Sequence, residues 1–278
     1  MDLAQVQRNT VTELSKHIAA ASIIEARCPL DHGKHYATPL SGVRLGTLNI
    51  LPAEPQHLVL SHVDIATLFT FRQVNQSAMR LVNTMTNYKK AVLSAPSALR
   101  MAIAIGVHHN YTISVLFRAL CDRHCADCGK LTHFLDVVTL RRICLSLNGR
   151  CDSRLPPVNT AKELPASLPS IDDTKLTSLY ETCTKFTPIP GRYTMQRKFR
   201  RCETRVTELI PRHSVFFDSN GVPEFKTALL NASAIPPQWG LSDGLPLKNV
   251  LLKSMTAVLA PWLKKASMKA EMGVWCPI

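Results

Sequence analysis

The first half of this chain takes its fold from residues 51–92, which read LPAEPQHLVLSHVDIATLFTFRQVNQSAMRLVNTMTNYKKAV. The stretch opens with a Leu-Pro-x-Glu sequence at Leu51, Pro52 and Glu54. Apolar residues then recur at the three- and four-residue spacing of amphipathic helices. They form two runs: Leu58, Val59, Leu60, Val63, Ile65, Leu68 and Phe71, then Val74, Ala78, Leu81 and Val82. A helical unit of about forty residues cannot bury all of this surface against itself, so we expect part of it to meet a partner protein.

The same stretch carries local signals for where its helices begin. Asp64 stands directly before Ile65, where a helix N-cap is expected. Pro52 suits the turn that enters a helix and not a helix interior. The segment from Leu48 to Val92 is therefore predicted to be a small helical module.

Composition sets the outer bounds. The chain has 278 residues, 46% of them apolar, which is enough for one good-sized core or two small ones. The N-terminus lacks the apolar run of a secretion signal, and Lys253, Ser254 and Pro261 interrupt the longest apolar run near the end. We therefore expect no membrane span and a cytoplasmic or nuclear location. The net charge of +13 is compatible with nucleic acid, anionic membrane or acidic proteins, and does not choose among them.

The fold class predicted from these patterns is mainly α, because strand-like alternation is scarce and no internal repeat is visible. A three-helix unit is followed by a helical domain with a small cysteine knuckle. We divide the chain into an N-terminal arm with a helix and a linker (1–47), the helical module (48–92), a helical pair with the cysteine knuckle (93–151), a Pro-rich linker with a helix at 172–184 and a basic segment (152–210), and a C-terminal region (211–278) ending in an amphipathic helix from Val250 to Leu263.

Five of the nine cysteines lie between residues 121 and 151. In a chain without a secretion signal, this clustering favours metal binding over disulfides. Cys125 and Cys128 form a C-x2-C pair that Gly129 follows, and fifteen residues separate the pair from Cys144. This spacing is typical of a zinc ribbon, although Leu147 stands where the fourth cysteine is expected.

Three thiolates leave one coordination position open, and Cys121, Cys151, His124 and His133 are the candidates for it. An ion held here would be structural, because no acid–base pair lies nearby in the sequence to use an activated water. Two other interpretations stay open. The thiols could be reduced and partly buried, or Cys125 and Cys128 could be a redox pair, although the βαβ pattern of such proteins is missing.

A basic segment follows a Pro-Gly turn at 190–191. Its cations are Arg192, Arg197, Lys198, Arg200, Arg201 and Arg205. Nucleic-acid binding through this segment, with the cysteine knuckle, is the alternative function, although only Tyr193 and Phe199 supply aromatic rings. An enzyme is disfavoured, because the chain contains no nucleophile elbow, phosphate-binding Gly loop or His-Glu metal helix.

Several landmarks occur in an order that resembles a large group of fungal F-box proteins. These proteins continue from the F-box into a helical pair that ends in Leu-Cys, a cysteine knuckle and a Pro-Gly-x-Tyr turn with a basic run. The corresponding landmarks here, which span residues 48 to 209, are Leu120-Cys121, Cys125 and Cys128, Phe134-Leu135, Cys144, Ala161-Lys162, Pro190-Gly191-Arg192-Tyr193 and Arg197–Arg201.

The resemblance implies a non-catalytic adaptor that docks onto the Skp-type subunit of a cullin–RING ubiquitin ligase and brings an unknown client protein to it. The residues it implies for adaptor binding are Leu51, Pro52, Glu54, Leu58, Leu60, Leu68, Phe71, Val74 and Leu81. Two departures stand out. Pro55 replaces the usual aliphatic residue and would weaken docking if it lay deep in the helix. Leu147 removes one cysteine from the metal site of the pattern.

Overall fold

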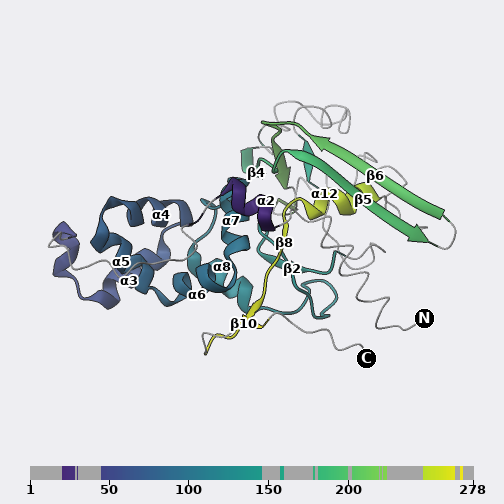
Figure 1. The fold of residues 1–278 in the computed structure, drawn as a ribbon. Coiled ribbons are helices and arrows are strands. Elements are labelled where there is room, and N and C mark those ends of the chain that lie inside the picture. The colour runs from purple at the N-terminus through teal and green to yellow at the C-terminus, as the bar shows by residue number, and fades with distance from the viewer. Residues whose placement is uncertain are drawn as a thin grey trace. The chain divides into compact units, whose positions relative to one another are not determined.

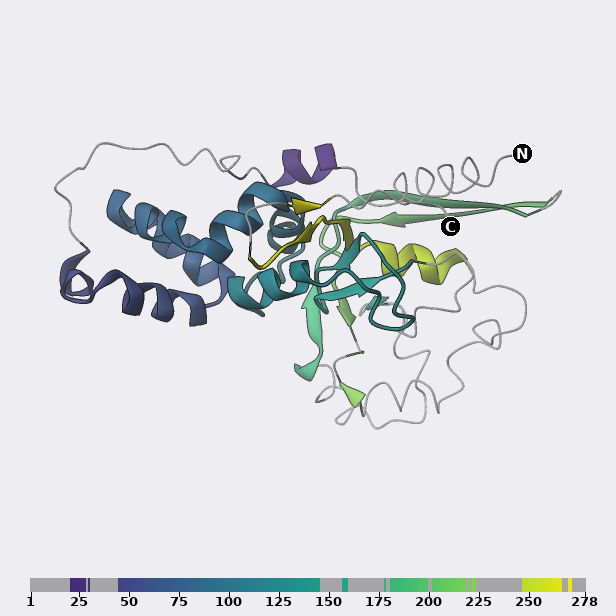
Figure 2. The ribbon, with the colours of Figure 1, turned by 90° about the horizontal axis from the view of Figure 1, so that it is seen from below.

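The computed structural model describes residues 21–28, 30, 45–145, 157–159, 178, 181–199, 202–218, 220, 222–223, 247–266 and 270–271. The chain divides into two compact units. The helical unit comprises Ala21–Arg123 with Ala260–Val274, and the mixed unit comprises Met1–Ala20, His124–Leu259 and Trp275–Ile278. Each unit is described by itself (Figures 1 and 2).

The helical unit is a succession of short helices. Their bounds are α2 (Ala21–Arg27), the 3-10 helix η1 (Gly46–Ile50), α3 (Ala53–His62), α4 (Ile65–Val74), α5 (Gln76–Thr84), α6 (Thr86–Ser94), α7 (Pro96–Ala104) and α8 (Ile113–Cys121). Within this unit α4 packs on α5, α6 on α8, and α2 on α7. The helical character predicted for the segment beginning at Leu48 is therefore confirmed.

Local side-chain caps explain why the helices begin where they do. Asp64 accepts a hydrogen bond from the backbone N–H of Thr67 at 2.9 Å, as its position in the sequence predicts. Asn75 accepts one from Ala78 at 2.8 Å and so starts α5 directly after α4 ends. Thr112 caps α8 in the same way. Each cap satisfies one of the backbone donors that the first turn of a helix leaves without an intrahelical partner.

The end of the chain completes the helical unit. Strands β9 (Trp262–Leu263) and β10 (Ala270–Glu271) form an antiparallel pair, and β9 packs on α8. The indole N–H of Trp262 donates to the carbonyl of Cys121 at 2.7 Å, and the buried Lys90 donates to the carbonyl of Lys265 at 2.8 Å. The module beginning at Leu48 is therefore part of a larger unit closed by residues some 170 positions away in the chain.

The described part of the mixed unit is rich in strands. Strand β1 (Phe134–Asp136) pairs with β2 (Arg141–Ile143) on one side and β8 (Ala257–Leu259) on the other. Strand β7 (Phe216–Asp218) lies between β3 (Val158–Asn159) and β4 (Thr184–Phe186). Strands β5 (Gly191–Phe199) and β6 (Cys202–Ile210) form a separate two-stranded ribbon, which α12 (Leu247–Ser254) contacts on both strands. The core of the β2-β1-β8 sheet contains Phe134, Ile143, Leu145 and Ala257.

The mainly α prediction therefore holds for the helical unit and is wrong for the described residues beyond His124. The helix predicted from Val250 to Leu263 ends at Ser254, and Ala257–Leu259 is a strand. Pro261 cannot continue a helix, and the backbone of Ala257–Leu259 pairs with β1 instead. The cysteine knuckle belongs to this strand-rich unit and not to a helical domain. The helix predicted at 172–184 lies largely outside the described residues.

Replacement of the α4 cap tests the local origin of these helices. We expect Asp64→Ala to lower the free energy of unfolding by about 1 kcal/mol, because Thr67 loses its acceptor. Asp64→Asn keeps the acceptor and should cost less. The hydrogen bonds from Thr67 hold the pKa of Asp64 below its usual value of 3.8. A lowered folded-state pKa stabilises above that value, so the advantage of Asp over Asn should shrink as the pH falls through and below it. Urea titrations at pH 7 and pH 3 would measure both effects, and an Asn variant as unstable as the Ala variant would contradict this account.

Candidate functional site

One face of η1 and α3 exposes apolar side chains to solvent. Ile50 is 82% exposed, Leu58 63% and Val59 53%, and Leu51 at 40% and Pro55 are also exposed. Along α3 these exposed residues have the spacing of a single helical face. We call this set of five residues the α3 surface. Exposed large apolar side chains that gather on one short segment are typical of a protein–protein contact.

The opposite face of α3 holds the helix to the rest of the unit. Leu60 is buried, and Gln56 is only 9% exposed although it is polar. The Gln56 side-chain amide donates to the carbonyl of Leu48 at 2.8 Å and to that of Leu51 at 2.7 Å. Both hydrogen bonds run back to η1 and the turn after it. Gln56 therefore fixes η1 and the turn after it against the start of α3, while the imidazole of His57 contacts the carbonyl of Leu81 and the hydroxyl of Thr84 on α5.

The structure separates the residues predicted for adaptor binding into two groups. Leu51, Pro52, Glu54, Leu58 and Val74 are exposed, and Phe71 is half-buried. The other three, Leu60, Leu68 and Leu81, are between 0% and 9% exposed. These three belong to the core of the helical unit, because a side chain so enclosed cannot reach a partner without unpacking its neighbours. The predicted residues with solvent exposure are therefore Leu51, Pro52, Glu54, Leu58, Phe71 and Val74.

Two residues of the α3 surface were missed as site residues. Ile50 precedes the Leu-Pro-x-Glu sequence, and Val59 lies between two leucines of the same run. Helical spacing alone does not say which face of a run is covered by its neighbours. The signal that could have found Val59 is its spacing, four residues after Pro55 and one after Leu58, which places the three on one helical face.

Pro55 occupies the third position of α3. The first backbone hydrogen bond of the helix runs from the N–H of Gln56 to the carbonyl of Pro52, at 3.3 Å. The N–H that proline lacks is therefore one that has no intrahelical acceptor at this position in any case. Pro55 is compatible with an intact first turn, and its ring adds apolar area to the α3 surface.

A tight turn organises the cysteine knuckle in the mixed unit. The N–H of Gly129 donates to the carbonyl of Cys125 at 3.0 Å, and the N–H of Cys125 donates to the carbonyl of Lys130 at 2.7 Å. Gly129 has φ +71°, a conformation that residues with a Cβ rarely adopt. The glycine after the C-x2-C pair thus serves the turn that its place in the sequence predicts.

The turn also attaches to β2, which brings in the third cysteine. The N–H of Ala126 donates to the carbonyl of Arg142 at 2.9 Å, and the Arg141 guanidinium meets the Asp127 carboxylate at 2.9 Å. Cys144 follows two residues after Arg142. The fifteen-residue spacer therefore folds back as the sequence predicts.

The thiol sulfurs of Cys125, Cys128 and Cys144 lie within 4.8 Å of one another, and those of Cys128 and Cys144 are 3.4 Å apart. These separations are far too long for a disulfide, whose sulfurs are about 2.05 Å apart. Sulfurs that share one tetrahedral zinc ion at about 2.3 Å would be about 3.8 Å apart. The donor set and its spacing thus fit a zinc ion, with one position left for a further ligand.

The candidates for the fourth ligand position lie in different parts of the chain. Among the described residues, His124 and His133 are not members of the three-residue group. Cys121 lies at the end of α8, in the helical unit. Cys151 and Leu147 lie outside the described residues. Burial, followed by the charge of Arg142, lowers the pKa of His133, so its imidazole is neutral near pH 7.

The predicted basic segment is a β-ribbon. Arg192, Arg197 and Lys198 lie on β5, Arg205 lies on β6, and Arg200 and Arg201 fall outside the described residues between the strands. The register sets Arg197 opposite Thr204 and Lys198 opposite Glu203. Among these cations only the side chain of Arg192 belongs to the described residues, and it is exposed. The cations are thus divided between two paired strands.

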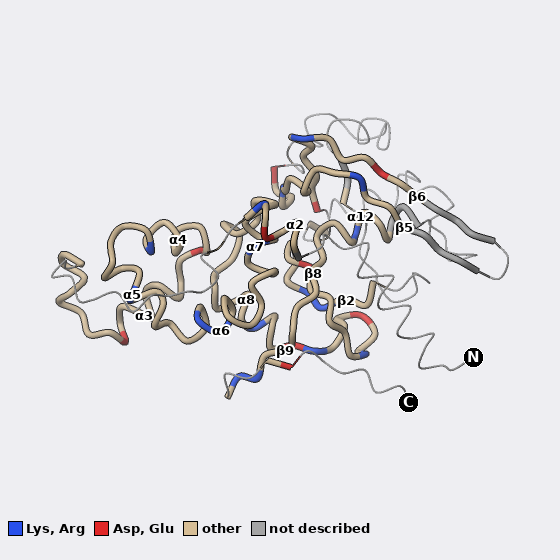
Figure 3. The backbone as a smooth tube through the Cα atoms, viewed as in Figure 1, with Lys and Arg blue, Asp and Glu red and all other residues tan. Residues whose placement is uncertain are grey.

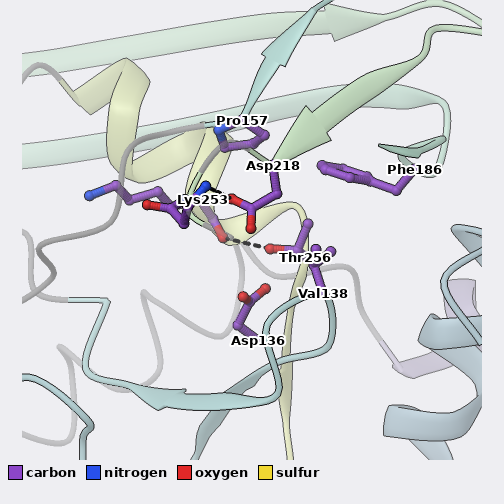
Figure 4. Close-up of a pocket in the computed structure, with 8 residues that line it drawn as sticks. Asp136, Val138, Pro157, Phe186, Asp218, Lys253 and Thr256 are labelled. Atoms are coloured by element: carbon purple, nitrogen blue, oxygen red, sulfur yellow. Dashed lines mark hydrogen bonds between the residues drawn. The ribbon is translucent and has the colours of Figure 1, made fainter. Parts of the chain in front are cut away.

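Figure 4 shows a small cavity in the mixed unit, lined by Asp136, Val138, Pro157, Phe186, Asp218, Asn220, Lys253 and Thr256. Its volume of about 10 Å³ is room for one water molecule and not for an organic substrate. Its polar groups are held by local turns: Asp136 accepts from the N–H of Thr139 at 3.1 Å, and the Thr256 hydroxyl donates to the carbonyl of Lys253 at 3.3 Å. These contacts describe a packed polar junction and not a catalytic centre.

Cys183 lies in the same unit and is no nucleophile. Burial, and secondarily the charge of Asp218, raises its pKa to about 11. The thiol therefore stays protonated at physiological pH, whereas a reactive cysteine requires a thiolate.

Comparison with known proteins identifies the class of the α3 region. The model of the F-box domain matches residues 48–90, so η1 through α6 contain an F-box domain. F-box domains bind Skp-type adaptors of cullin ubiquitin ligases, and proteins that carry them are generally non-catalytic adaptors. No curated protein and no solved structure matches the chain significantly. No described helix has the length and hydropathy needed to cross a membrane.

A pair of neighbouring substitutions tests how α3 is anchored. We expect Gln56→Ala to lower the free energy of unfolding by about 1–3 kcal/mol, because two carbonyls lose a buried donor. Pro55→Ala should lower it by less than about 1 kcal/mol, since no intrahelical bond is gained and only unfolded-state entropy changes. Chemical denaturation of both variants decides this point. A Pro55→Ala protein that is clearly more stable than wild type would show that the proline strains the first turn.

Proposed function

We propose that this protein is the substrate-receptor subunit of a cullin–RING ubiquitin ligase, which binds the Skp-type adaptor through the α3 surface and acts without catalysing a reaction itself. The observation that carries the proposal is the coincidence of the F-box match with that surface. Binding to an adaptor through apolar contacts requires exposed apolar side chains, and the α3 surface provides them.

The hydrophobic free energy available from a few exposed apolar side chains is large enough to support binding. Removing apolar area from water is worth roughly 25 cal/mol per Å², so a few large side chains can supply several kcal/mol before the costs of association. Val74, at the end of α4, is 67% exposed and could extend the contact. Glu54 is an exposed acid in the first turn of α3 and would lie at the rim.

The mixed unit is the part of the chain left to bind a client, because the helical unit contains the F-box. The resemblance to fungal F-box proteins extends into this unit, and one of its landmarks has a structural reason. In the Pro-Gly-x-Tyr sequence the hydroxyl of the buried Tyr193 donates to the carbonyl of Ile189 at 2.7 Å and so closes the turn into β5. We infer that this landmark preserves a fold and not a catalytic group.

We also propose that Cys125, Cys128 and Cys144 hold a structural zinc ion. The support is the approach of three sulfurs from two segments that a Gly129 turn and β2 hold together. The ion would tie the knuckle to the β2-β1-β8 sheet, and folding and metal binding would then be coupled. The fourth ligand is Cys121, Cys151, a histidine or water.

Adaptor capture tests the proposed function. We expect a purified Skp-type adaptor to bind wild-type protein, and Leu58→Asp with Val59→Asp to weaken binding by at least about tenfold, because two charges would enter an apolar contact. Both positions are exposed, so the fold should tolerate the change. The matched control is Leu93→Asp with Val115→Asp, since these side chains are 51% and 40% exposed in the same unit but lie off the α3 surface. Titration calorimetry compares the two, and an adaptor that ignores the wild type, or binds both double variants equally, would refute the proposal.

Metal analysis tests the zinc site. We expect one zinc per chain by atomic emission, loss of the ion in Cys128→Ser, and its retention in Cys183→Ala, where a thiol outside the cluster is removed. Cys121→Ser and Cys151→Ser distinguish the candidates for the fourth position. Replacement of the cysteine that is the fourth ligand should weaken zinc binding by about tenfold or more, and replacement of the other should not. A wild-type protein that contains no zinc after expression with added metal, or a Cys128→Ser protein that retains it, would rule the site out.

A further inference from the structure

The indole ring of Trp262 lies against two cationic side chains of the helical unit. The guanidinium carbon of Arg123 is 4.8 Å from the ring centroid, and the ammonium nitrogen of Lys264 is 5.6 Å from it. Both distances lie in the range at which the negative face of an aromatic ring attracts a cation. Arg123 and Lys264 are exposed, whereas Trp262 is half-buried. The ring therefore holds two charged groups at the solvent boundary.

The fold fixes the position of this ring. The indole N–H donates to the carbonyl of Cys121 at 2.7 Å, and β9, which contains Trp262, packs on α8. The turn that follows is also tied down, because the buried Lys90 donates to the carbonyl of Lys265 at 2.8 Å. A cation that rests on a fixed ring has less conformational freedom than an ordinary surface side chain. It therefore loses less entropy when it binds an anion.

Positive charge is in excess around this pair. The neighbouring segments carry three more exposed cations, which are Lys89 of α6, Arg118 of α8 and Lys265 after β9. Helix α8 packs on both α6 and β9, and Figure 3 shows basic residues of these segments along one side of the helical unit. The acids among the described residues of the same segments are Asp122 and Glu271. Five exposed cations and two acids leave a net charge of +3.

The structure contains one carboxylate at this site. Glu271 on β10 lies 2.6 Å from the ammonium group of Lys264. Among the described residues no carboxylate forms an ion pair with Arg123. The planar guanidinium of an arginine matches the two oxygens of a carboxylate, so a second carboxylate can be accepted beside the first.

We propose that Arg123 and Lys264, held on Trp262, bind an acidic segment of a partner protein through its carboxylates. Arg123 takes one carboxylate in a bidentate contact, and Lys264 exchanges Glu271 for another. The fixed ring makes this a defined site within the broader positive surface.

The site is separate from the α3 surface. Thr112, directly before α8, bridges to Asp64, which lies between α3 and α4. Arg123 follows the other end of α8, whose nine residues extend about 14 Å along the helix axis. The inference therefore goes beyond adaptor binding and does not depend on it.

Two other anionic partners fit the site less well. Single-stranded nucleic acid stacks its bases on open aromatic faces, but Arg123 and Lys264 already lie over the ring of Trp262. The closely spaced charges of nucleic acid or of an anionic membrane would also meet the exposed carboxylates of Asp122 and Glu271, which repel them. A peptide can place neutral residues beside those two acids. An acidic protein segment therefore fits the charges best.

Fluorescence anisotropy tests the site with the full chain and a labelled ten-residue peptide that alternates Glu with Ser. We expect the wild type to bind the peptide, and Arg123→Gln with Lys264→Gln to weaken binding by at least about tenfold, because both carboxylate contacts are lost. Arg123→Lys keeps the charge but loses the planar fork, so it should weaken binding about threefold. A peptide with Lys in place of Glu should not bind.

The matched control is Lys185→Gln with Arg212→Gln. It removes the same two types of cation at exposed positions in the mixed unit, and it should leave binding nearly unchanged. Circular dichroism shows that both double variants fold.

Replacement of Glu271 tests the site in the opposite direction. Glu271→Gln removes the carboxylate that competes for Lys264 and lowers the local negative charge, so the acidic peptide should bind about threefold more tightly. An ion pair that served only to hold β10 in place would give no such gain.

The inference is wrong if the wild type does not bind the peptide, if the two double variants lose affinity equally, or if Glu271→Gln brings no gain. It is also wrong if a single-stranded oligonucleotide or vesicles that contain phosphatidylserine bind more tightly than the peptide. Adaptor capture by the Arg123 and Lys264 variants should match that of the wild type, since neither residue belongs to the α3 surface. Failure of this inference and failure of the proposed function are thus seen separately.

Discussion

Helix α3 is held to the helical unit by the buried side chain of Leu60 and by His57, whose imidazole lies 3.2 Å from the carbonyl oxygen of Leu81 and 3.0 Å from the hydroxyl of Thr84 on α5. The helix has ten residues, and the apolar side chains of Leu58 and Val59 on its other side are exposed to solvent. The two hydrogen bonds from Gln56 to the carbonyls of Leu48 and Leu51 tie the start of α3 to η1 and the turn after it. The function proposed for the protein depends on this anchorage. The polar side chain of Gln56 is buried and hydrogen-bonded within the unit, and the apolar side chains of Leu58 and Val59 are exposed.

The mixed unit follows a different rule, in which segments distant in sequence meet at β1. Strand β1 pairs with β2, only a few residues later, and with β8, more than a hundred residues later. The backbone hydrogen bond from Ala126 to Arg142 joins the knuckle to this sheet, and α12 packs against both strands of the ribbon. A zinc ion at the three cysteines would reinforce a junction that backbone hydrogen bonds already define. Where α12 packs on the ribbon, Tyr193, Ile210 and Leu251 are buried.

The alternation of the ribbon is visible in the sequence once the register is known. Tyr193 and Met195 on β5 stand opposite Glu208 and Val206 on β6. The many cations interspersed among these positions dominate the local composition, and they favoured an interpretation as one basic patch. Pairing of β5 with β6 divides the cations between two strands. The prediction of one helix from Val250 to Leu263 was wrong for a related reason. The helical periodicity comes from neighbouring residues, whereas the strand β8 forms by pairing with β1, which is distant in the sequence.

The sequence by itself determined the features that depend on neighbouring residues. These are the caps at Asp64 and Thr112, the turn at Gly129 and the helical identity of residues 48–90, in which each hydrogen bond closes within a few positions of the chain. Only the tertiary structure decided which side of each helix is covered and which strands pair. It placed Leu60 in the core while Val59 beside it faces solvent, and it brought Cys144 to the knuckle. The physical reason is that burial and strand pairing are properties of contacts between distant segments, and helical spacing describes a face without saying what lies against it.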